Sequence, residues 1–380
     1  MASMPTRQLG KNGPRVSAIG FGAMGLSAFY GTPASDEERF KVLDRAIELG
    51  STYIDSADVY GDSEDLLGKY FKKYPQQREK VFLATKFANI ILPGGKRVVR
   101  GDAQYARESI AKSLKRLGLD SVDLYYVHRI DKNVPIEETV GALKELVDAG
   151  KIKNIGLSEC SSDTLRRAYA VHPIAAVQIE YSPFSLDIEH ENIGLLKACR
   201  ELGVAIVCYS PLSRGILTGQ IQSPDDLEET DSRKQMPRFS KENFSKNLQL
   251  VETLTSIAKK KNCTPGQLTL AWILAQGEDF IVIPGTTKIK NLEENVATAK
   301  IKLSKEEEEE IRKACEKADI VGGRYPEARS GFLDAPIPIP GIGWNWSGLE
   351  LELELELELE LELVGIGIGI GRNWLELAVN

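Results

Sequence analysis

The chain has 380 residues, 42% of them hydrophobic, with 48 basic and 55 acidic side chains that give a net charge of −7. This length suits one large globular domain, and the charges form no long basic run of the kind that binds nucleic acid. The sequence also lacks an apolar signal segment, a run of about 18 apolar residues and a CxxC or histidine cluster, so we expect a cytoplasmic protein with no membrane span and no metal site.

The chain begins with a predicted β-hairpin at residues 6–17, with Asn12-Gly13 as its turn. The apolar run 18–22 predicts a first strand, and residues 36–50 predict an amphipathic helix that begins at Asp36 and stops at Gly50. Short apolar runs and helical periodicities then alternate, interrupted by a polar insertion at 222–243. The further predicted strands are 52–55, 80–86, 122–128, 152–157, 175–180, 204–210 and 280–284. The further predicted helices are 63–73, 102–118, 136–150, 161–171, 191–203, 244–261 and 265–276.

This alternation gives eight strands, each followed by a helix or by a loop and a helix, with no evident domain linker. It predicts an α/β protein built as a single (β/α)₈ TIM barrel, preceded by the N-terminal β-hairpin. A doubly wound sheet is disfavoured, because no GxGxxG follows the first strand.

Four polar residues stand at or just after the carboxyl ends of early strands: Asp55, Tyr60, Lys86 and His128. These ends share one face of a parallel barrel, so the four side chains are predicted to converge. A lysine cation beside a tyrosine makes the phenol a better proton donor. A carboxylate can hold the lysine and a histidine can orient a carbonyl, so the set fits protonation of a carbonyl while another group delivers hydride. Taken singly, each residue also has a structural explanation, as a turn cap, loop packing, a solvated strand end or a core histidine.

Seven motifs in this order resemble signatures of the aldo/keto reductase family: IDSADVYG, TKF, YYVHRID, GLSECS, QIEYSPF, CYSPLSRG and IPGTTKIKNLEEN. The resemblance covers about residues 5–340 and is greatest to the branch that includes perakine reductase and similar fungal enzymes. It implies that Tyr60 is the proton donor, that Lys86 and Asp55 tune it, and that His128 orients the carbonyl. It also implies that NADPH lies extended across the barrel mouth and that the hairpin closes the opposite end.

The later motifs of the resemblance imply the cofactor contacts. Ser158 and Gln178 would end the fifth and sixth strands and bind the nicotinamide carboxamide, and Tyr209 would stack on the ring. The pyrophosphate would contact Ser210, Pro211, Leu212, Arg214 and Gly215. The start of a helix within 284–295 would bind the 2′-phosphate of NADPH through Thr286, Thr287, Lys288 and Lys290. The remaining implied cofactor contacts are Gly285, Glu294 and Asn295.

Two positions depart from the pattern of the family. Glu159 stands where many relatives have asparagine, which puts one carboxamide contact in question. Asn291 stands where many relatives have arginine, so the 2′-phosphate would depend on Lys288 or Lys290. The structural alternatives are a core aromatic for Tyr209 and an ordinary solvated helix start for the lysines.

The predicted function is reduction of an aldehyde or ketone, a small-molecule carbonyl substrate, to the alcohol with NADPH. The alternative is a redox-sensing regulatory subunit that holds NADPH with little turnover, which the family also contains. A phosphate-binding barrel isomerase is a third interpretation, against which the tyrosine–lysine pair argues. The pocket is predicted to have aromatic walls, from Phe29, Tyr30, Phe87 and Phe184.

The segment 341–380 differs in kind from the rest of the chain. It holds eight glutamates and one arginine, so the remainder carries 47 charges of each sign, and the acidity says nothing about a substrate. Residues 349–363 alternate Leu and Glu, and residues 364–371 contain a Gly-Ile repeat. We expect a barrel domain at 1–340 and a low-complexity tail at 341–380 that is disordered, self-associating or artefactual and has no catalytic role. The sequence sets no expectation for the oligomeric state.

Overall fold

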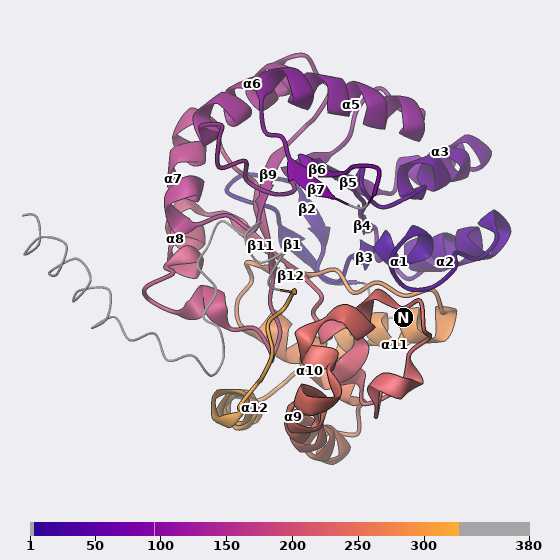
Figure 1. Cartoon of the computed structure of the whole chain (residues 1–380), viewed down its shortest axis with the longest axis vertical. Coiled ribbons are helices and arrows are strands. Elements are labelled where there is room, and N and C mark those ends of the chain that lie inside the picture. Colours follow the sequence, from indigo (N-terminus) through magenta and orange to yellow (C-terminus); the bar gives the residue numbers. More distant parts are fainter. Residues whose placement is uncertain (1–3, 95, 327–380) are drawn as a thin grey trace, which may run out of the picture. The chain divides into compact units, whose positions relative to one another are not determined.

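The computed structural model describes residues 4–94 and 96–326 of the chain. In this part, a parallel sheet of eight strands lies at the centre and helices surround it (Figure 1). The predicted (β/α)₈ barrel is confirmed. The predicted tail at 341–380 lies outside the described residues.

The eight strands follow one another around the sheet in chain order, as expected for repeated strand–helix units. At the seam, the Gly20 amide donates to the Val282 carbonyl over 2.8 Å and the Val282 amide donates to the Ala18 carbonyl over 3.0 Å. These hydrogen bonds join the first and last strands, so the sheet closes into a barrel. The strands are β3 (Phe21–Gly22), β4 (Tyr53–Asp55), β5 (Phe82–Phe87), β8 (Leu124–Val127), β9 (Ile155–Ser158), β10 (Ala176–Glu180), β11 (Ala205–Tyr209) and β12 (Phe280–Val282).

Side-chain caps fix where several of the surrounding helices begin. The Ser35 hydroxyl accepts from the Glu38 amide before α2, and the Asp102 carboxylate accepts from the Tyr105 amide before α5. No described helix is long and apolar enough to cross a membrane. The helices are α1 (Met24–Ser27), α2 (Asp36–Glu48), α3 (Ser63–Lys73), α4 (Pro75–Arg78), α5 (Ala103–Leu117), α6 (Ile136–Asp148), α7 (Ser162–Val171), α8 (Leu195–Leu202), α9 (Lys241–Lys260), α10 (Pro265–Ala275), α11 (Ile289–Ala297) and α12 (Lys305–Lys317).

The predicted N-terminal hairpin is present, as β1 (Thr6–Gln8) and β2 (Arg15–Ser17). Leu9 and Val16 pack with apolar side chains of the barrel interior, so the hairpin closes one end of the barrel. Its turn differs from the expectation. The Gly13 amide donates to the Gly10 carbonyl, so Lys11 and Asn12 form the corner of a longer loop.

Two features near the opposite end of the barrel were not predicted. A second hairpin, β6 (Asn89–Ile91) and β7 (Arg97–Val99), follows β5. The sequence feature that indicates this hairpin is the Pro93-Gly94 turn between two runs of β-branched residues. The polar insertion forms short 3₁₀ helices, at Pro224–Asp226, Ser232–Gln235 and Pro237–Phe239.

Candidate active site

A cavity of about 580 Å³ lies at the carboxyl ends of the barrel strands, a size that suits a small ligand. Asp55, Ser158 and Tyr209, the last residues of β4, β9 and β11, all line it. Every residue singled out from the sequence as catalytic or cofactor-binding lines this cavity except Lys86 and Lys290. The lining residues from that set are Asp55, Tyr60, His128, Ser158, Gln178, Tyr209, Ser210, Pro211, Leu212, Arg214, Gly215, Gly285, Thr286, Thr287, Lys288, Glu294 and Asn295.

Lys86 is fully buried beside Asp55, which lines the cavity. Its ammonium group donates to the Asp55 carboxylate and, over 2.7 Å, to the Ser56 carbonyl. The same nitrogen lies 4.9 Å from the centre of the Tyr60 ring, within range of a cation–π interaction. The Tyr60 and His128 ring centres are 5.6 Å apart, with the rings nearly perpendicular at 87°. The four predicted side chains are therefore neighbours.

Burial controls the ionisation of the Lys86–Asp55 pair. It lowers the pKa of Lys86 and raises the pKa of Asp55, and in each case the charge of the partner acts in the opposite direction. Gln178 donates to the second Asp55 oxygen over 2.7 Å, which further favours the carboxylate. Asp55 thus accepts from both a cation and an amide.

Tyr60 and His128 are both uncharged at neutral pH. Burial raises the pKa of Tyr60 well above 10.0, the Asp55 carboxylate raises it further, and the Arg129 cation opposes them. Burial also lowers the pKa of His128 well below 6.5, assisted by Arg129. The cavity therefore offers a neutral phenol, which can give a proton, beside a neutral imidazole. Arg129 was not singled out from the sequence.

Gln178 is placed differently from the prediction. It lies in the middle of β10, paired with Ser158 of β9 and Val207 of β11, and does not end the strand. It still lines the cavity, although the strand continues for two residues beyond it. Its amide nitrogen is engaged by Asp55, which leaves its oxygen as the group available to a ligand.

Glu159 occupies the position where asparagine was expected. It is buried, adopts a left-handed backbone with φ 52°, and binds the guanidinium of Arg324. The Tyr209 hydroxyl donates to it over 2.7 Å. The Glu159 carboxylate is therefore fully engaged by the protein and holds the Tyr209 ring in place.

The loop after β11 has an unusual backbone. Ser213, Arg214 and Gly215 have consecutive positive φ values of 45°, 56° and 100°. Such conformations are rare outside glycine and are often found at ligand sites, because they aim successive amides at one point. The Arg214 side chain is buried against Glu180, with a 3.2 Å ion pair.

The predicted loop entering a helix is α11, whose N-terminal cap is Lys288. Thr286, Lys288 and Asn291 line the cavity, whereas Lys290 is exposed and does not. A Cβ on Gly285 would lie 2.6 Å from the Gly22 carbonyl oxygen, so only glycine permits this close approach beside the cavity.

The aromatic walls were predicted in part. Phe29 and Tyr30 line the cavity, but Phe87 and Phe184 are buried outside it, and Phe87 stacks on Tyr125 with ring centres 5.0 Å apart.

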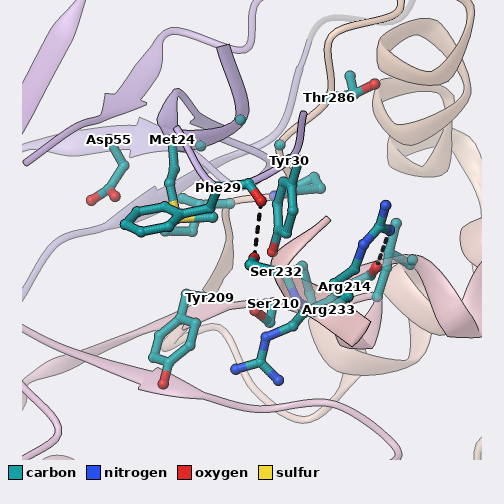
Figure 2. Close-up of a pocket in the computed structure, with 18 of the residues that line it drawn as sticks. Met24, Phe29, Tyr30, Asp55, Tyr209, Ser210, Arg214, Ser232, Arg233 and Thr286 are labelled. Carbon is teal, nitrogen blue, oxygen red and sulfur yellow. Dashed lines mark hydrogen bonds between the residues drawn. The ribbon is translucent and has the colours of Figure 1, made fainter. Parts of the chain in front are cut away.

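Ser232 and Arg233 of the polar insertion lie among the residues that line the cavity (Figure 2). Ser232 donates to the Phe29 carbonyl over 2.9 Å, and Arg233 donates to the Arg214 carbonyl over 2.8 Å. Sequence reasoning missed these lining residues, together with Met24, Val59, Arg129 and Met236.

Comparison with known proteins identifies relatives over most of the chain. The model of the aldo/keto reductase family matches residues 18–316. Aldo-keto reductase str7 of Strobilurus tenacellus is 56% identical over 338 residues, which is 88% of this chain and 98% of that protein. The aldo-keto reductase yakc of Schizosaccharomyces pombe, whose name includes NADP(+), is 52% identical over 339 residues, again 88% of this chain and 98% of the relative.

Two solved structures are similar along most of their length. The thermostable aldo-keto reductase Tm1743, solved with the inhibitor epalrestat, has a TM-score of 0.65 and 31% identity, covering 82% of this chain and 100% of that one. The glycerol dehydrogenase AKR11B4 of Gluconobacter oxydans has a TM-score of 0.73 and 25% identity, covering 89% and 98%.

Proposed function

Because the chain belongs to the aldo/keto reductase family, an oxidoreductase family, we propose that it reduces an aldehyde or ketone to the alcohol with NADPH. The observation that carries the proposal is the meeting of Asp55, Tyr60, Lys86 and His128 at one cavity, with a neutral phenol beside a neutral imidazole.

The residues around the cavity fit a nicotinamide dinucleotide. Tyr209 offers a flat ring, and Ser158 and the Gln178 oxygen offer polar contacts for an amide. The left-handed loop 213–215 and the start of α11 offer amides and a cation to phosphate groups. When bound, NADPH supplies the hydride that the carbonyl carbon receives.

The protein then supplies a proton and holds the substrate. The Tyr60 hydroxyl donates its proton to the carbonyl oxygen as negative charge develops there, and the alcohol forms with one hydride and one proton added across the C=O bond. Neutral His128 orients the oxygen by a hydrogen bond. Lys86, held by Asp55, stabilises the tyrosinate that remains until solvent returns the proton.

We assign NADPH in preference to NADH because Thr286 and Lys288 meet at the start of α11, where a 2′-phosphate would find a cation and a helix N-terminus. The name of the S. pombe relative is consistent with this choice. No feature of the described residues favours the regulatory subunit or the phosphate-binding isomerase over a reductase.

The test is multiple-turnover oxidation of NADPH, followed by absorbance, with a panel of aromatic and aliphatic aldehydes and ketones. Many turnovers per protein molecule with at least one carbonyl compound are expected. Tight NADPH binding without turnover for any member of a broad panel would support the regulatory alternative instead.

A further inference from the structure

Arg129 is a buried cation at the cavity wall that the proposed reaction does not use. It follows His128 in the chain, is only 9% exposed and lines the cavity. Its Nη1 donates to the His128 carbonyl over 2.6 Å and to the Ser158 hydroxyl over 3.4 Å. Its Nε and Nη2 donate to no described residue, and neither atom is sealed from solvent. One edge of the guanidinium is therefore open toward the cavity.

The lack of a carboxylate partner distinguishes Arg129 from other arginines around the cavity. Arg214 pairs with Glu180 over 3.2 Å and Arg233 pairs with Asp231 over 2.6 Å. The carboxylate of Glu159 is already held by Arg324. Arg129 forms no direct ion pair within the described part of the chain, and the Glu159 charge acts on it only at longer range. A buried, unpaired charge is costly, so such a residue is expected to meet its counterion in a bound ligand.

The position of Arg129 indicates which ligand that is. It adjoins His128 and its charge acts on both Tyr60 and His128, so it lies at the reacting end of the cavity. Apolar side chains of Met24, Phe29 and Val59 also line the cavity, and the Phe29 ring centre lies 6.4 Å from that of Tyr60. A substrate in this place would present its carbonyl to Tyr60 and a second group to Arg129.

We propose that Arg129 binds a carboxylate on the substrate, so that the preferred substrates are apolar or aromatic carbonyl compounds that carry a carboxylate near the aldehyde or ketone. The inference rests on the proposed function. The open Nε–Nη2 edge of a guanidinium matches the two oxygens of a carboxylate, which lysine cannot match with two parallel hydrogen bonds.

The test compares substrates of the same shape and different charge. The 2-, 3- and 4-formylbenzoates are each paired with the corresponding formylbenzamide, and kcat/KM is measured with saturating NADPH. The wild-type protein is expected to prefer at least one benzoate by about tenfold or more, which corresponds to about 1.4 kcal/mol. In Arg129→Met the ratio for that pair falls to about one, and Arg129→Lys gives an intermediate ratio. The ratio is informative even though loss of the cation also changes the electrostatics of Tyr60, because that change affects both substrates.

Arg97→Met is the matched control, since Arg97 is another cation that lines the cavity. It is expected to keep the preference for the benzoate. If Arg97→Met removes the preference and Arg129→Met does not, the assignment to Arg129 is wrong.

A binding measurement separates this inference from the proposed function. Calorimetric titration of the NADP⁺-saturated protein with benzoate and with benzamide is expected to show tighter binding of benzoate, lost in Arg129→Met, whether or not the chain turns over aldehydes. Equal binding of the two ligands by the wild type overturns the inference while leaving reductase activity untouched. A tenfold loss of NADPH affinity in Arg129→Met with an unchanged benzoate ratio would show that Arg129 serves the cofactor instead.

Discussion

Glu159 and Arg324 form a buried ion pair at the barrel mouth, in which two guanidinium nitrogens donate to the two carboxylate oxygens, each over 3.1 Å. Glu159 follows β9, whereas Arg324 belongs to the segment after α12, so the pair joins distant parts of the chain. The adjacent Tyr325 lines the cavity, with its hydroxyl 3.1 Å from that of Tyr209. The ion pair therefore holds part of the cavity wall in place.

Glu159→Gln should destabilise the protein, because it leaves Arg324 buried without its counterion. Removing one partner of a buried pair typically costs about 3–5 kcal/mol. Urea unfolding at pH 7 measures the change. Glu137→Gln is the control, because its pair with Arg167 is exposed to solvent and its loss should destabilise the protein far less. If the two variants lost equal unfolding free energy, burial would not explain the cost of breaking the Glu159–Arg324 pair.

The same pair predicts a pH dependence of stability. Burial raises the pKa of Glu159, but the Arg324 and Arg129 cations and the hydrogen bonds from the Tyr209 hydroxyl and the Glu180 amide together outweigh it, so the pKa lies below the ordinary 4.5. A lowered carboxyl pKa contributes stability above the unfolded value and loses it as the pH falls through the native pKa. The stability difference between wild type and Glu159→Gln should therefore narrow below pH 4.5. A difference that stays constant from pH 7 to pH 3 would argue against this account.

Lys288 and Lys290 form a natural test of cofactor choice, since only Lys288 lines the cavity. Lys288→Ala should weaken NADPH binding by about tenfold or more, because a charge-assisted hydrogen bond contributes about 1.5–3 kcal/mol. NADH, which lacks the 2′-phosphate, should be little affected. Lys290→Ala is the control and should leave the affinity for both cofactors nearly unchanged. Fluorescence titration with each cofactor gives the affinities, and parallel losses for NADPH and NADH would exclude recognition of the phosphate by Lys288.

Replacement of Asp58 should stabilise the protein, whereas replacement of Glu159 should destabilise it. Burial, reinforced by Glu64, raises the pKa of Asp58 to about 7, and its Oδ1 has no hydrogen-bond partner among the described residues. The unfolded chain ionises near 3.8, so the folded state is penalised increasingly from about pH 4 to pH 7 and by a constant amount above that. Asp58→Asn should therefore have a higher free energy of unfolding than wild type, by on the order of a few kcal/mol at most, and the gain, measured by urea unfolding, should be larger at pH 8 than at pH 5. If Asp58→Asn were stabilised most at acid pH, the raised pKa of Asp58 would be refuted.

Much of the barrel could be predicted because its signals are local. Apolar runs placed Asp55, Lys86 and His128 at strand ends, and the structure has them at β4, β5 and directly after β8. The position of Gln178 was misjudged because an apolar run does not say where within it a strand stops. The boundaries of strands depend on hydrogen bonds to neighbours, which the sequence does not display.

The partners of buried charges could not be predicted, because they are remote in the sequence. Glu159 and Arg324 are 165 positions apart, and no spacing rule links them. Arg129 was read only as part of the motif YYVHRID. Its significance depends on the lack of a direct ion pair to a carboxylate among the described residues, which is a property of the packed structure.

The separation of the chain into a barrel and a tail stays a prediction. The residues that line the cavity lie between Gly22 and Tyr325, so deletion of 341–380 removes none of them. The shortened chain should keep its melting temperature and its kcat/KM within about twofold of the full chain, a difference of only about 0.4 kcal/mol. Normal folding with lost turnover would mean that the tail contributes to the site.

Tyr60→Phe tests the central claim most directly, because it removes one hydroxyl and keeps the ring. With NADPH and the best aldehyde of the panel, the variant should lose about 10²–10⁴-fold in kcat, the usual value of general acid catalysis. Its dissociation constant for NADPH, measured by fluorescence titration, should stay close to that of the wild type. A variant that binds NADPH normally and retains near-normal turnover would contradict the assignment of Tyr60 as the proton donor.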